Sequence, residues 1–215
     1  MKLFQYILEN FNRIMVLAVE HFFMFFISLV VATIIGVALS IFATEEGREK
    51  IGKVIVSITG AAQAVPSIAV IALVFIYVGI GKFPAIISLI IYSLVPILFN
   101  ATSGILSVPK EVIESGKGMG FTKKQILWKI KMPIATPVIL GGVRSAATIV
   151  IGTAVIASVI GGGGLGDLIF VGLRLNRQEA LFAGAISSAL MAIIIDRILA
   201  IIEKRITPKG LTVGR

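Results

Sequence analysis

Long apolar runs separated by short polar segments make up most of this 215-residue chain. A transmembrane helix needs roughly 20 largely apolar residues to cross the hydrocarbon core of a bilayer. Runs of this length cover residues 22–43, 54–78, 83–106, 134–160 and 180–202. The pattern predicts an all-α integral membrane protein with about five transmembrane helices.

Residues 1–20 precede the first run and have a different pattern. Their apolar side chains recur at helical spacing on one face, while Lys2, Glu9 and Arg13 lie elsewhere. This is typical of an amphipathic helix that lies in the bilayer interface. A secretory signal peptide is the alternative, but Glu9 and Glu20 stand where such a peptide carries basic residues.

The longest polar segment, residues 107–133, predicts a cytoplasmic helical hairpin between the third and fourth runs. Ser107 is placed to cap a first helix that has Pro109 in its first turn, where the missing N–H is harmless. Gly118 and Gly120 are expected to end this helix, because glycine just past a helix adopts the left-handed stop conformation.

A second helix of the hairpin is predicted to begin at Thr122–Gln125. The sequence there is T-x-x-Q, the signature of a capping box. Ile126, Leu127 and Ile130 then form an apolar stripe at helical spacing. Pro133 is expected to close this helix and to open the fourth span.

Composition excludes several kinds of chemistry. Apolar residues make up 57% of the chain and charged residues 14%, whereas soluble domains carry about 25% charged residues. Residues 1–215 are therefore expected to form one transmembrane domain. The lack of cysteine and the single histidine, His21, exclude thiolate sites and histidine clusters for metals.

Candidate catalytic groups are equally scarce. The sequence has no paired carboxylates, no nucleophile–base pair and no G-x-x-x-x-G-K-[ST] phosphate loop. We therefore expect no catalytic residue, no metal ligand and no bound cofactor in this chain. If ATP drives its activity, the ATPase is another chain.

The net charge of +9 reflects membrane topology rather than nucleic-acid binding, because the basic residues flank apolar runs. Segments 44–53, 107–133 and 203–215 share one side and contain thirteen Lys and Arg residues, against five on the other side. Basic residues concentrate on the cytoplasmic side of membrane proteins. The prediction is a multi-pass protein of the cell (inner or cytoplasmic) membrane with its N-terminus outside and its C-terminus in the cytoplasm.

Five glycines follow the fourth run closely, at positions 161–164 and 166, and the candidates for a loop or gate among them are Gly161, Gly163, Gly164 and Gly166. Three of them form G-x-G-x-x-G, which binds dinucleotides where it joins a strand to a helix and an acid follows about 20 residues on. Here the motif follows a membrane span, and residue 186 is isoleucine. An external re-entrant or tightly turned loop explains the glycines better, either as a gate or as a helix end.

Polar residues and prolines occur within the second and third runs. Gln63, Pro66 and Ser67 lie in one run, and Pro96 and Asn100 lie four apart in the other. Proline removes a helix hydrogen bond and favours a kink. The polar side chains are expected either to line a substrate pathway or to satisfy the broken helix bonds.

Ionisable residues also fall within span limits. Arg144 and Asp196 are placed to pair between the last two spans, since isolated charges are costly in lipid. Alternatively, Asp196 and Arg197 lie near enough to the surface for their charged ends to reach water.

The last span carries small residues at four-residue intervals, namely Ala180, Gly184, Ser188 and Ala192. Such a stripe lets helix backbones approach closely, either within the chain or across a dimer.

The central hairpin carries a family resemblance. Glu114-Ser115-Gly116, Gly120, Ile130 and Met132-Pro133 have the spacing of the E-A-A-x3-G-x9-I-x-L-P loop, with substitutions only at Ser115, Gly116 and Met132. This loop is similar to that of the membrane subunits of binding-protein-dependent ABC importers. The resemblance implies a coupling helix that fits a groove on an ATPase subunit, with Glu114, Ser115, Gly116, Gly120, Ile130 and Pro133 as its coupling residues.

Within that family the chain is most similar to permeases for osmoprotectants of the glycine betaine, carnitine and choline class. The similarity lies in residues 63–67, 118–139 and 159–169, and in the tail from 183 to Gly210. Methionine or amino-acid importers share the five-span frame and a similar glycine-rich loop. The tail favours the osmoprotectant class.

The resemblance implies a transport subunit rather than an enzyme, of the type I ABC importer fold. It would work as a homo- or heterodimer with two ATPase subunits, which bind ATP and Mg, and with an extracellular substrate-binding protein. Gln63, Pro66, Ser67 and Asn100 are candidates for the substrate pathway. A self-contained secondary carrier or channel is the alternative, but we find no internal repeat of the kind that such carriers often contain.

Overall fold

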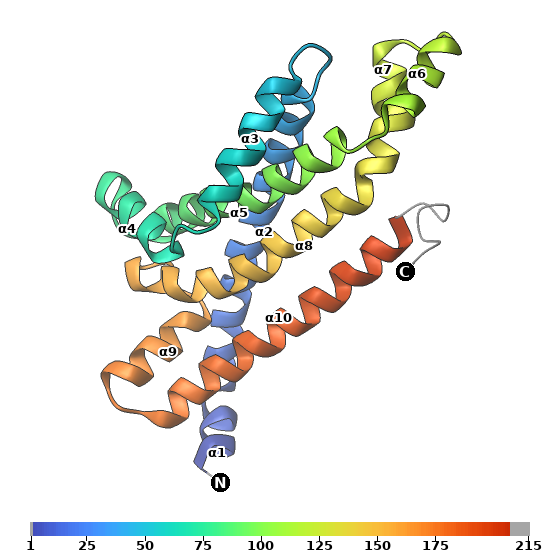
Figure 1. Ribbon diagram of the computed structural model, residues 1–215. Coiled ribbons are helices and arrows are strands. Elements are labelled where there is room, and N and C mark those ends of the chain that lie inside the picture. Colours follow the sequence, from blue (N-terminus) through green and yellow to red (C-terminus); the bar gives the residue numbers. More distant parts are fainter. Residues whose placement is uncertain (1, 207–215) are drawn as a thin grey trace. The chain divides into compact units, whose positions relative to one another are not determined.

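The computed structural model describes residues 2–206, and every regular element in this range is a helix (Figure 1). The helices are α1 (Lys2–Glu9), α2 (Phe11–Ala43), α3 (Glu49–Ala62), α4 (Ser67–Val78), α5 (Lys82–Leu106), α6 (Lys110–Gly118), α7 (Lys123–Ile126), the π-helix η1 (Leu127–Lys131), α8 (Met132–Ala157), the 3-10 helix η2 (Ser158–Ile160), α9 (Leu165–Arg174) and α10 (Gln178–Ile206). The predicted all-α class is confirmed. Residues 207–215, which include the end of the tail used for the resemblance and most of the last topology segment, lie outside the described part.

Four helical stretches of the described chain are long and apolar enough to cross a membrane: Phe11–Ala43, Lys82–Leu106, Lys123–Ile160 and Gln178–Ile206. The number rises to five when the broken pair α3 and α4 counts as one span. The predicted count of about five is therefore confirmed.

The N-terminal helix is shorter than predicted. The single helix expected over residues 1–20 is divided, because α1 ends at Glu9 and one turn residue, Asn10, separates it from α2. The interfacial position of α1 stays a prediction. The Asn10 amide N–H and its side-chain Nδ2 both donate to the Tyr6 carbonyl, at 3.0 Å each. Residues from Phe11 onward belong to the first long helix, because their helical pattern continues without a breaker into the apolar run.

The second predicted span is broken rather than kinked. Helix α3 ends at Ala62 and α4 begins at Ser67, after Pro66 in an extended conformation with φ −61° and ψ 134°. Proline lacks an N–H, and it disfavours the helical conformation in the residue before it. These constraints end the helix instead of bending it.

Helix α9 was not predicted. The sequence predicts an external connection between the last two spans, and in the structure residues 161–164 and 175–177 of that connection are non-helical while α9 lies between them. Leu165 and Leu168 are fully buried and pack with Ile14 of α2 and Ala183 of α10. Apolar side chains at i and i+3 in a ten-residue segment are a weak helical signal, and this tertiary packing stabilises it.

The chain divides into two compact units, each built from separate stretches of sequence. One contains Val65–Ser93, Ala146–Arg197 and the N-terminal residues up to Ala32, and its core includes the contacts of α9. The other contains Thr33–Ala64, Leu94–Ser145 and the residues from Ile198 onward. A cluster around Ala101, Ile105, Ala135 and Ile139 lies in the second unit. The single domain expected from the sequence stays a prediction.

The small-residue stripe of α10 has a packing partner within the chain. Gly184 lies so close to α9 that a Cβ atom there would be 2.9 Å from the Leu168 Cβ atom. Ala180 and Ala183 are also buried. At this end of α10 the small residues therefore pack within the chain. This is the first alternative given for the stripe, the other being contact across a dimer.

Candidate functional site

The first arm of the hairpin is α6, and it begins two residues later than predicted. Pro109 occupies the N-cap position with φ −56° and ψ 135°. The Ser107 hydroxyl donates to the Gly104 carbonyl at 2.9 Å, so it satisfies the end of α5. The prediction that Ser107 caps the first arm is therefore wrong.

Helix α6 ends in a Schellman motif at Gly120. Its φ is +81°, which favours glycine over every residue with a Cβ atom. The Gly120 N–H donates to the Lys117 carbonyl at 2.9 Å, and the Phe121 N–H donates to the Gly116 carbonyl at 3.0 Å. These two bonds are the pair that defines the motif. Gly118 is the last helical residue, so Gly120 alone is the stop.

The second arm begins with the predicted capping box. The Gln125 N–H donates to Thr122 Oγ1 at 3.3 Å, and the Thr122 N–H donates to Gln125 Oε1 at 2.8 Å. The capping-box prediction is confirmed.

This arm does not close at Pro133. Helix α7 continues through the π-helical turn η1 into α8, as one helical stretch from Lys123 to Ile160. The Met132 N–H already bonds to the Leu127 carbonyl, five residues back rather than four. The π-helical turn has already shifted the backbone hydrogen bonds from i−4 to i−5 partners. A proline directly after it therefore interrupts a bonding pattern that is no longer regular. Pro133 is therefore tolerated in the first turn of α8.

The two arms of the hairpin pack on each other through Gly116 and Ile130. Both residues are buried, and a Cβ atom at Gly116 would lie 2.5 Å from the Ile130 Cδ1 atom. A small apolar cluster surrounds this contact: Val108, Ile126 and Ile130, with Ile113, Phe121 and Ile134 packed against them. Ile126 and Ile130 of the predicted apolar stripe thus hold the hairpin closed.

Other residues of the hairpin are directed outward. Glu114 and Ser115 are exposed on α6, and the Ser115 hydroxyl donates to the Glu111 carbonyl at 2.8 Å. Met119 lies at the tip with 67% of its surface exposed. A partner can reach these exposed side chains directly, whereas Gly116 and Ile130 are buried inside the hairpin.

A glutamate outside the predicted site joins the hairpin to the turn between α2 and α3. Lys117 of α6 donates to Glu46 Oε1 at 2.6 Å, and Lys123 of α7 lies 3.3 Å from Glu46 Oε2. These two hydrogen-bonded lysines hold the pKa of Glu46 below its usual value, and Glu46 in turn raises the pKa of Lys117. No local motif marks Glu46, since 71 residues separate it from Lys117.

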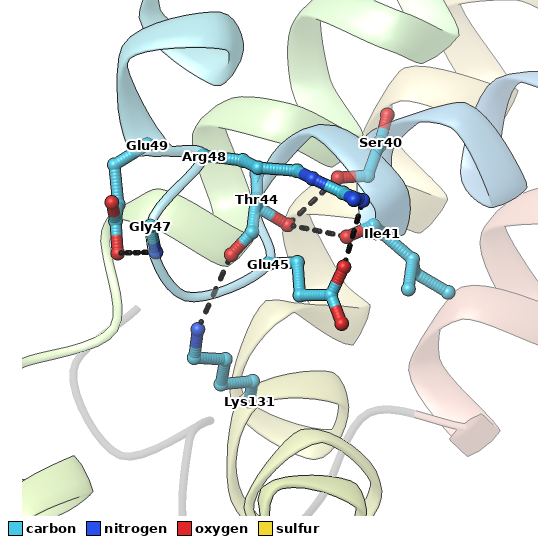
Figure 2. A network of polar contacts seen from close by, with 8 residues as sticks. All are labelled: Ser40, Ile41, Thr44, Glu45, Gly47, Arg48, Glu49 and Lys131. Atoms are coloured by element: carbon cyan, nitrogen blue, oxygen red, sulfur yellow. Dashed lines mark hydrogen bonds and ion pairs between the residues drawn. The ribbon is translucent and has the colours of Figure 1, made fainter.

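The turn that carries Glu46 is braced by polar contacts (Figure 2). Arg48 Nη1 lies 2.8 Å from Glu45 Oε2, and the Arg48 guanidinium stacks 4.1 Å from the centroid of the Phe42 ring. The Gly47 N–H donates to Glu49 Oε1 at 3.2 Å. The Thr44 hydroxyl donates to the Ser40 carbonyl at 2.7 Å, and Lys131 Nζ donates to the Thr44 carbonyl at 3.5 Å.

A cavity of about 640 Å³ lies between this turn and the hairpin. Its charged lining residues are Glu45, Glu46, Glu49, Lys110, Glu114, Lys117, Lys123, Lys124 and Lys131. Apolar side chains from the end of α2, including Ile41 and Phe42, line it as well. Glu114, the predicted coupling residue, therefore borders the same space as Glu46.

At the glycine-rich loop, Gly161, Gly163 and Gly164 all have positive φ, between 77° and 82°. Gly166 differs, because it lies within α9, where a Cβ atom would collide with the Val155 carbonyl oxygen and the Ser158 side chain. The Gly164 N–H donates to Glu20 Oε2 at 3.3 Å. The loop is thus a tightly turned helix connection, and its role as a gate stays a prediction.

Glu20 also pairs with Lys82 Nζ, at 2.6 Å. Asp167, in the first turn of α9, is half-buried. Burial of the carboxyl is the largest cause that raises the pKa of Asp167, and the nearby negative charge of Glu20 is the second. Sequence reasoning missed this group of charges because its members come from three separate segments.

The candidate pathway residues have different surroundings. Gln63 is exposed at the C-cap of α3, exposed Pro66 precedes α4, and Ser67 is the first residue of α4. Asn100 Nδ2 donates to the Pro96 carbonyl at 2.8 Å, one turn back on α5. The carbonyl that Pro96 leaves without its helix partner is that of Tyr92, four residues earlier, so this bond does not decide between the two alternatives.

Asn100 also marks a close approach of two helices. A Cβ atom at Gly142 of α8 would lie 2.5 Å from the Asn100 Cβ atom. The position of Asn100 along a pathway stays a prediction.

Arg144 has an acidic partner that the sequence did not suggest. Its Nη1 atom lies 3.4 Å from Glu203 Oε2, near the end of α10. The pairing of Arg144 with Asp196 stays a prediction.

The long apolar helices of the described chain are those of an integral membrane protein. The chain belongs to the family described as "Binding-protein-dependent transport system inner membrane component", whose profile matches residues 36–208. It is accordingly a multi-pass membrane protein and a transport subunit.

Curated relatives match over most of their length. The chain is 41% identical over 192 residues to the "Glycine betaine/carnitine/choline transport system permease protein OpuCB" of Bacillus subtilis (strain 168), covering 89% of this chain and 88% of that protein. It is 38% identical to the "Choline transport system permease protein OpuBB" of the same organism, covering 96% and 94%. It is 37% identical to the "Osmoprotectant import permease protein OsmY" of Salmonella typhimurium, covering 88% and 80%.

Solved structures share the fold. An inward-facing structure of the MetNI methionine ABC transporter matches with a TM-score of 0.77 and 22% identity, covering 93% of this chain and 99% of that chain. An amino acid ABC transporter matches with a TM-score of 0.75 and 15% identity, covering 94% and 98%. The chain therefore has the fold of type I ABC importer permeases.

Proposed function

We propose that this chain is the membrane subunit of an ATP-driven importer of small quaternary-amine osmoprotectants such as glycine betaine, choline and carnitine. The observation that carries this proposal is the 41% identity over 89% of the chain to a permease named for these three solutes. Relatives named for choline and for osmoprotectants add support, at 38% and 37% identity. The methionine and amino acid transporters match at 22% identity or less, which supports the fold alone.

The hairpin is proposed to couple this subunit to a separate ATPase. Glu114 and Ser115 would contact the ATPase, because they are exposed on α6. Gly116, Gly120 and Ile130 would keep the hairpin rigid through the packing and the helix stop described above. Pro133 lies where the second arm passes without interruption into α8, so that movement of the hairpin reaches the membrane.

The assembly would contain components that this chain lacks. The sequence has no phosphate loop, so ATP and Mg would bind to the ATPase subunits and this chain would catalyse no reaction. A second permease subunit, identical or homologous, and an extracellular substrate-binding protein would complete it. The hairpin would face the cytoplasm and the N-terminus the outside, as the distribution of basic residues favours.

Transport would follow alternating access, in which hairpin movement opens a path to one side of the membrane at a time. Gln63, Pro66, Ser67 and Asn100 remain the candidates for residues along that path. The loop of Gly161, Gly163 and Gly164, with Gly166 beside it, remains the candidate for an external gate.

A competition assay tests the solute class. The chain is reconstituted in proteoliposomes with its ATPase and binding protein, and uptake of labelled choline is measured with ATP inside. Excess glycine betaine or carnitine should reduce choline uptake strongly, whereas methionine should leave it unchanged. Competition by methionine would instead indicate an amino-acid importer, and uptake without ATP would indicate a secondary carrier or channel.

A further inference from the structure

Three contacts connect the α2–α3 turn to the hairpin, one from each successive part of the hairpin. Lys117 of α6 and Lys123 of α7 hold the two carboxylate oxygens of Glu46, at 2.6 and 3.3 Å. Lys131 of η1 donates to the carbonyl of Thr44 at 3.5 Å. Glu46 therefore accepts from both arms of the hairpin at once.

Because a cavity separates the turn from the hairpin, these long side chains bridge the two across it. Ile41 and Phe42 line it from α2, while Ile113 and Ile126 line it from the hairpin. The apolar cluster of the hairpin is built from residues 108–134 and includes none from the turn. Of the three contacts, removal of the two at Glu46 would leave the 3.5 Å bond from Lys131 to Thr44 across this space, so the hairpin would be held less firmly to the turn.

Contacts within the turn connect it to both flanking helices. Arg48 pairs with Glu45, and the Glu49 carboxylate accepts from the Gly47 N–H (Figure 2). Arg48 also stacks on the Phe42 ring of α2. A shift of the Glu46 carboxylate is therefore carried to the ends of α2 and α3 rather than absorbed locally.

We propose that Glu46 is a positioning residue that transmits hairpin movement to the cytoplasmic ends of α2 and α3. The covalent chain carries the same movement into α5 and α8 alone, because α6 follows α5 and η1 leads into α8. Through Glu46, α2 and α3 would move together with α5 and α8. This inference rests on the proposed coupling of the hairpin to an ATPase, and it adds the α2–α3 turn to that coupling.

The functional test measures choline transported per ATP hydrolysed in the reconstituted complex. Glu46→Lys should lower this ratio about three- to tenfold while hydrolysis continues, the range expected for a modest coupling between two sites carried by exposed ion pairs. Adding Lys117→Glu to Glu46→Lys should restore part of the ratio, because the pair of positions 46 and 117 is re-formed with its charges exchanged while Lys123 faces the new positive charge. Lys50→Gln, which removes one charge in the first turn of α3, is the control and should keep the wild-type ratio.

A second readout does not depend on the solute. The chain has no cysteine, so spin labels at Lys50→Cys and Met119→Cys report the distance between α3 and the hairpin tip. Addition of a non-hydrolysable ATP analogue should leave this distance unchanged when Glu46 is present. In the Glu46→Lys background the same addition should change or broaden it.

A wild-type ratio in Glu46→Lys, or the same label distances in both backgrounds, would overturn the role of Glu46. Failure of the wild-type complex to transport choline would instead contradict the proposed solute class. In that case the label distances still decide for or against Glu46.

Discussion

Gly116 and Ile130 meet where the two arms of the hairpin cross, so closely that a Cβ atom on Gly116 would lie 2.5 Å from the Ile130 Cδ1 atom. The related loop pattern has alanine at the position of Gly116. Here the Cδ1 methyl group of Ile130 occupies the space that an alanine methyl would take. The two positions are therefore coupled, and a double-mutant cycle can measure that coupling.

Gly116→Ala alone should change stability by less than about 1 kcal/mol, since the helix gain of up to about 1 kcal/mol is offset by the displaced tip of Ile130. Ile130→Val alone removes the Cδ1 methyl and should cost about 1 kcal/mol. The free energy of unfolding of the double variant should be higher than the sum of the two single changes predicts. Thermal unfolding of the purified complex measures all three variants. Strict additivity would contradict the contact.

Gly120→Ala should destabilise the hairpin by about 1 to 2 kcal/mol, because φ at this position is +81°. Gly118→Ala is the matched control two residues away. Gly118 is helical and has open space where a Cβ atom would be added, so alanine should stabilise α6 by up to about 1 kcal/mol. Thermal unfolding of both variants decides this, and equal melting temperatures would contradict the left-handed stop.

Glu114→Lys should abolish substrate-stimulated ATP hydrolysis while leaving membrane insertion intact. Glu114 is exposed on α6 and borders the cavity shared with Glu46. The measurement is hydrolysis with and without choline-loaded binding protein in reconstituted vesicles. Glu179→Lys, a charge reversal in the first turn of α10, serves as the control, and unchanged stimulation in Glu114→Lys would be evidence against the coupling role.

Asp167→Asn should raise the melting temperature at pH 7. Burial, with Glu20 next, raises the pKa of Asp167 in the folded protein. A carboxyl whose pKa is higher in the folded protein than in the unfolded chain binds a proton more readily when the protein is folded. The folded protein therefore loses stability as the pH rises through the folded pKa. The gain from asparagine should therefore be present at pH 7 and shrink on acidification towards the unfolded pKa. A gain that grows as pH falls would refute this.

Local sequence rules anticipated the hairpin better than its surroundings. The capping box at Thr122–Gln125 and the stop at Gly120 depend on bonds within a few residues, and both occur as expected. Ser107 failed as a cap because the end of α5 lies within reach of its hydroxyl. Pro133 failed as a stop because a π-helical turn precedes it, a feature that no propensity rule marks.

Long-range features lay beyond the sequence. Glu46 is separated by 71 residues from Lys117, and only the fold brings them together. Helix α9 is short, and the glycines before it hid its apolar spacing, so the burial of Leu165 and Leu168 could not be foreseen. The break at Pro66 shows the same limit, because a proline in an apolar run can bend a helix or end it.

Cross-linking from single cysteines tests the central claim most directly, since the chain has none of its own. Ser115→Cys on exposed α6 should form a cross-link to the ATPase subunit in native membranes. Leu175→Cys, exposed after α9 in a segment predicted to lie outside, should form none. A cross-link from Leu175→Cys but not from Ser115→Cys would contradict the account, because the hairpin would then not be the surface that meets the ATPase.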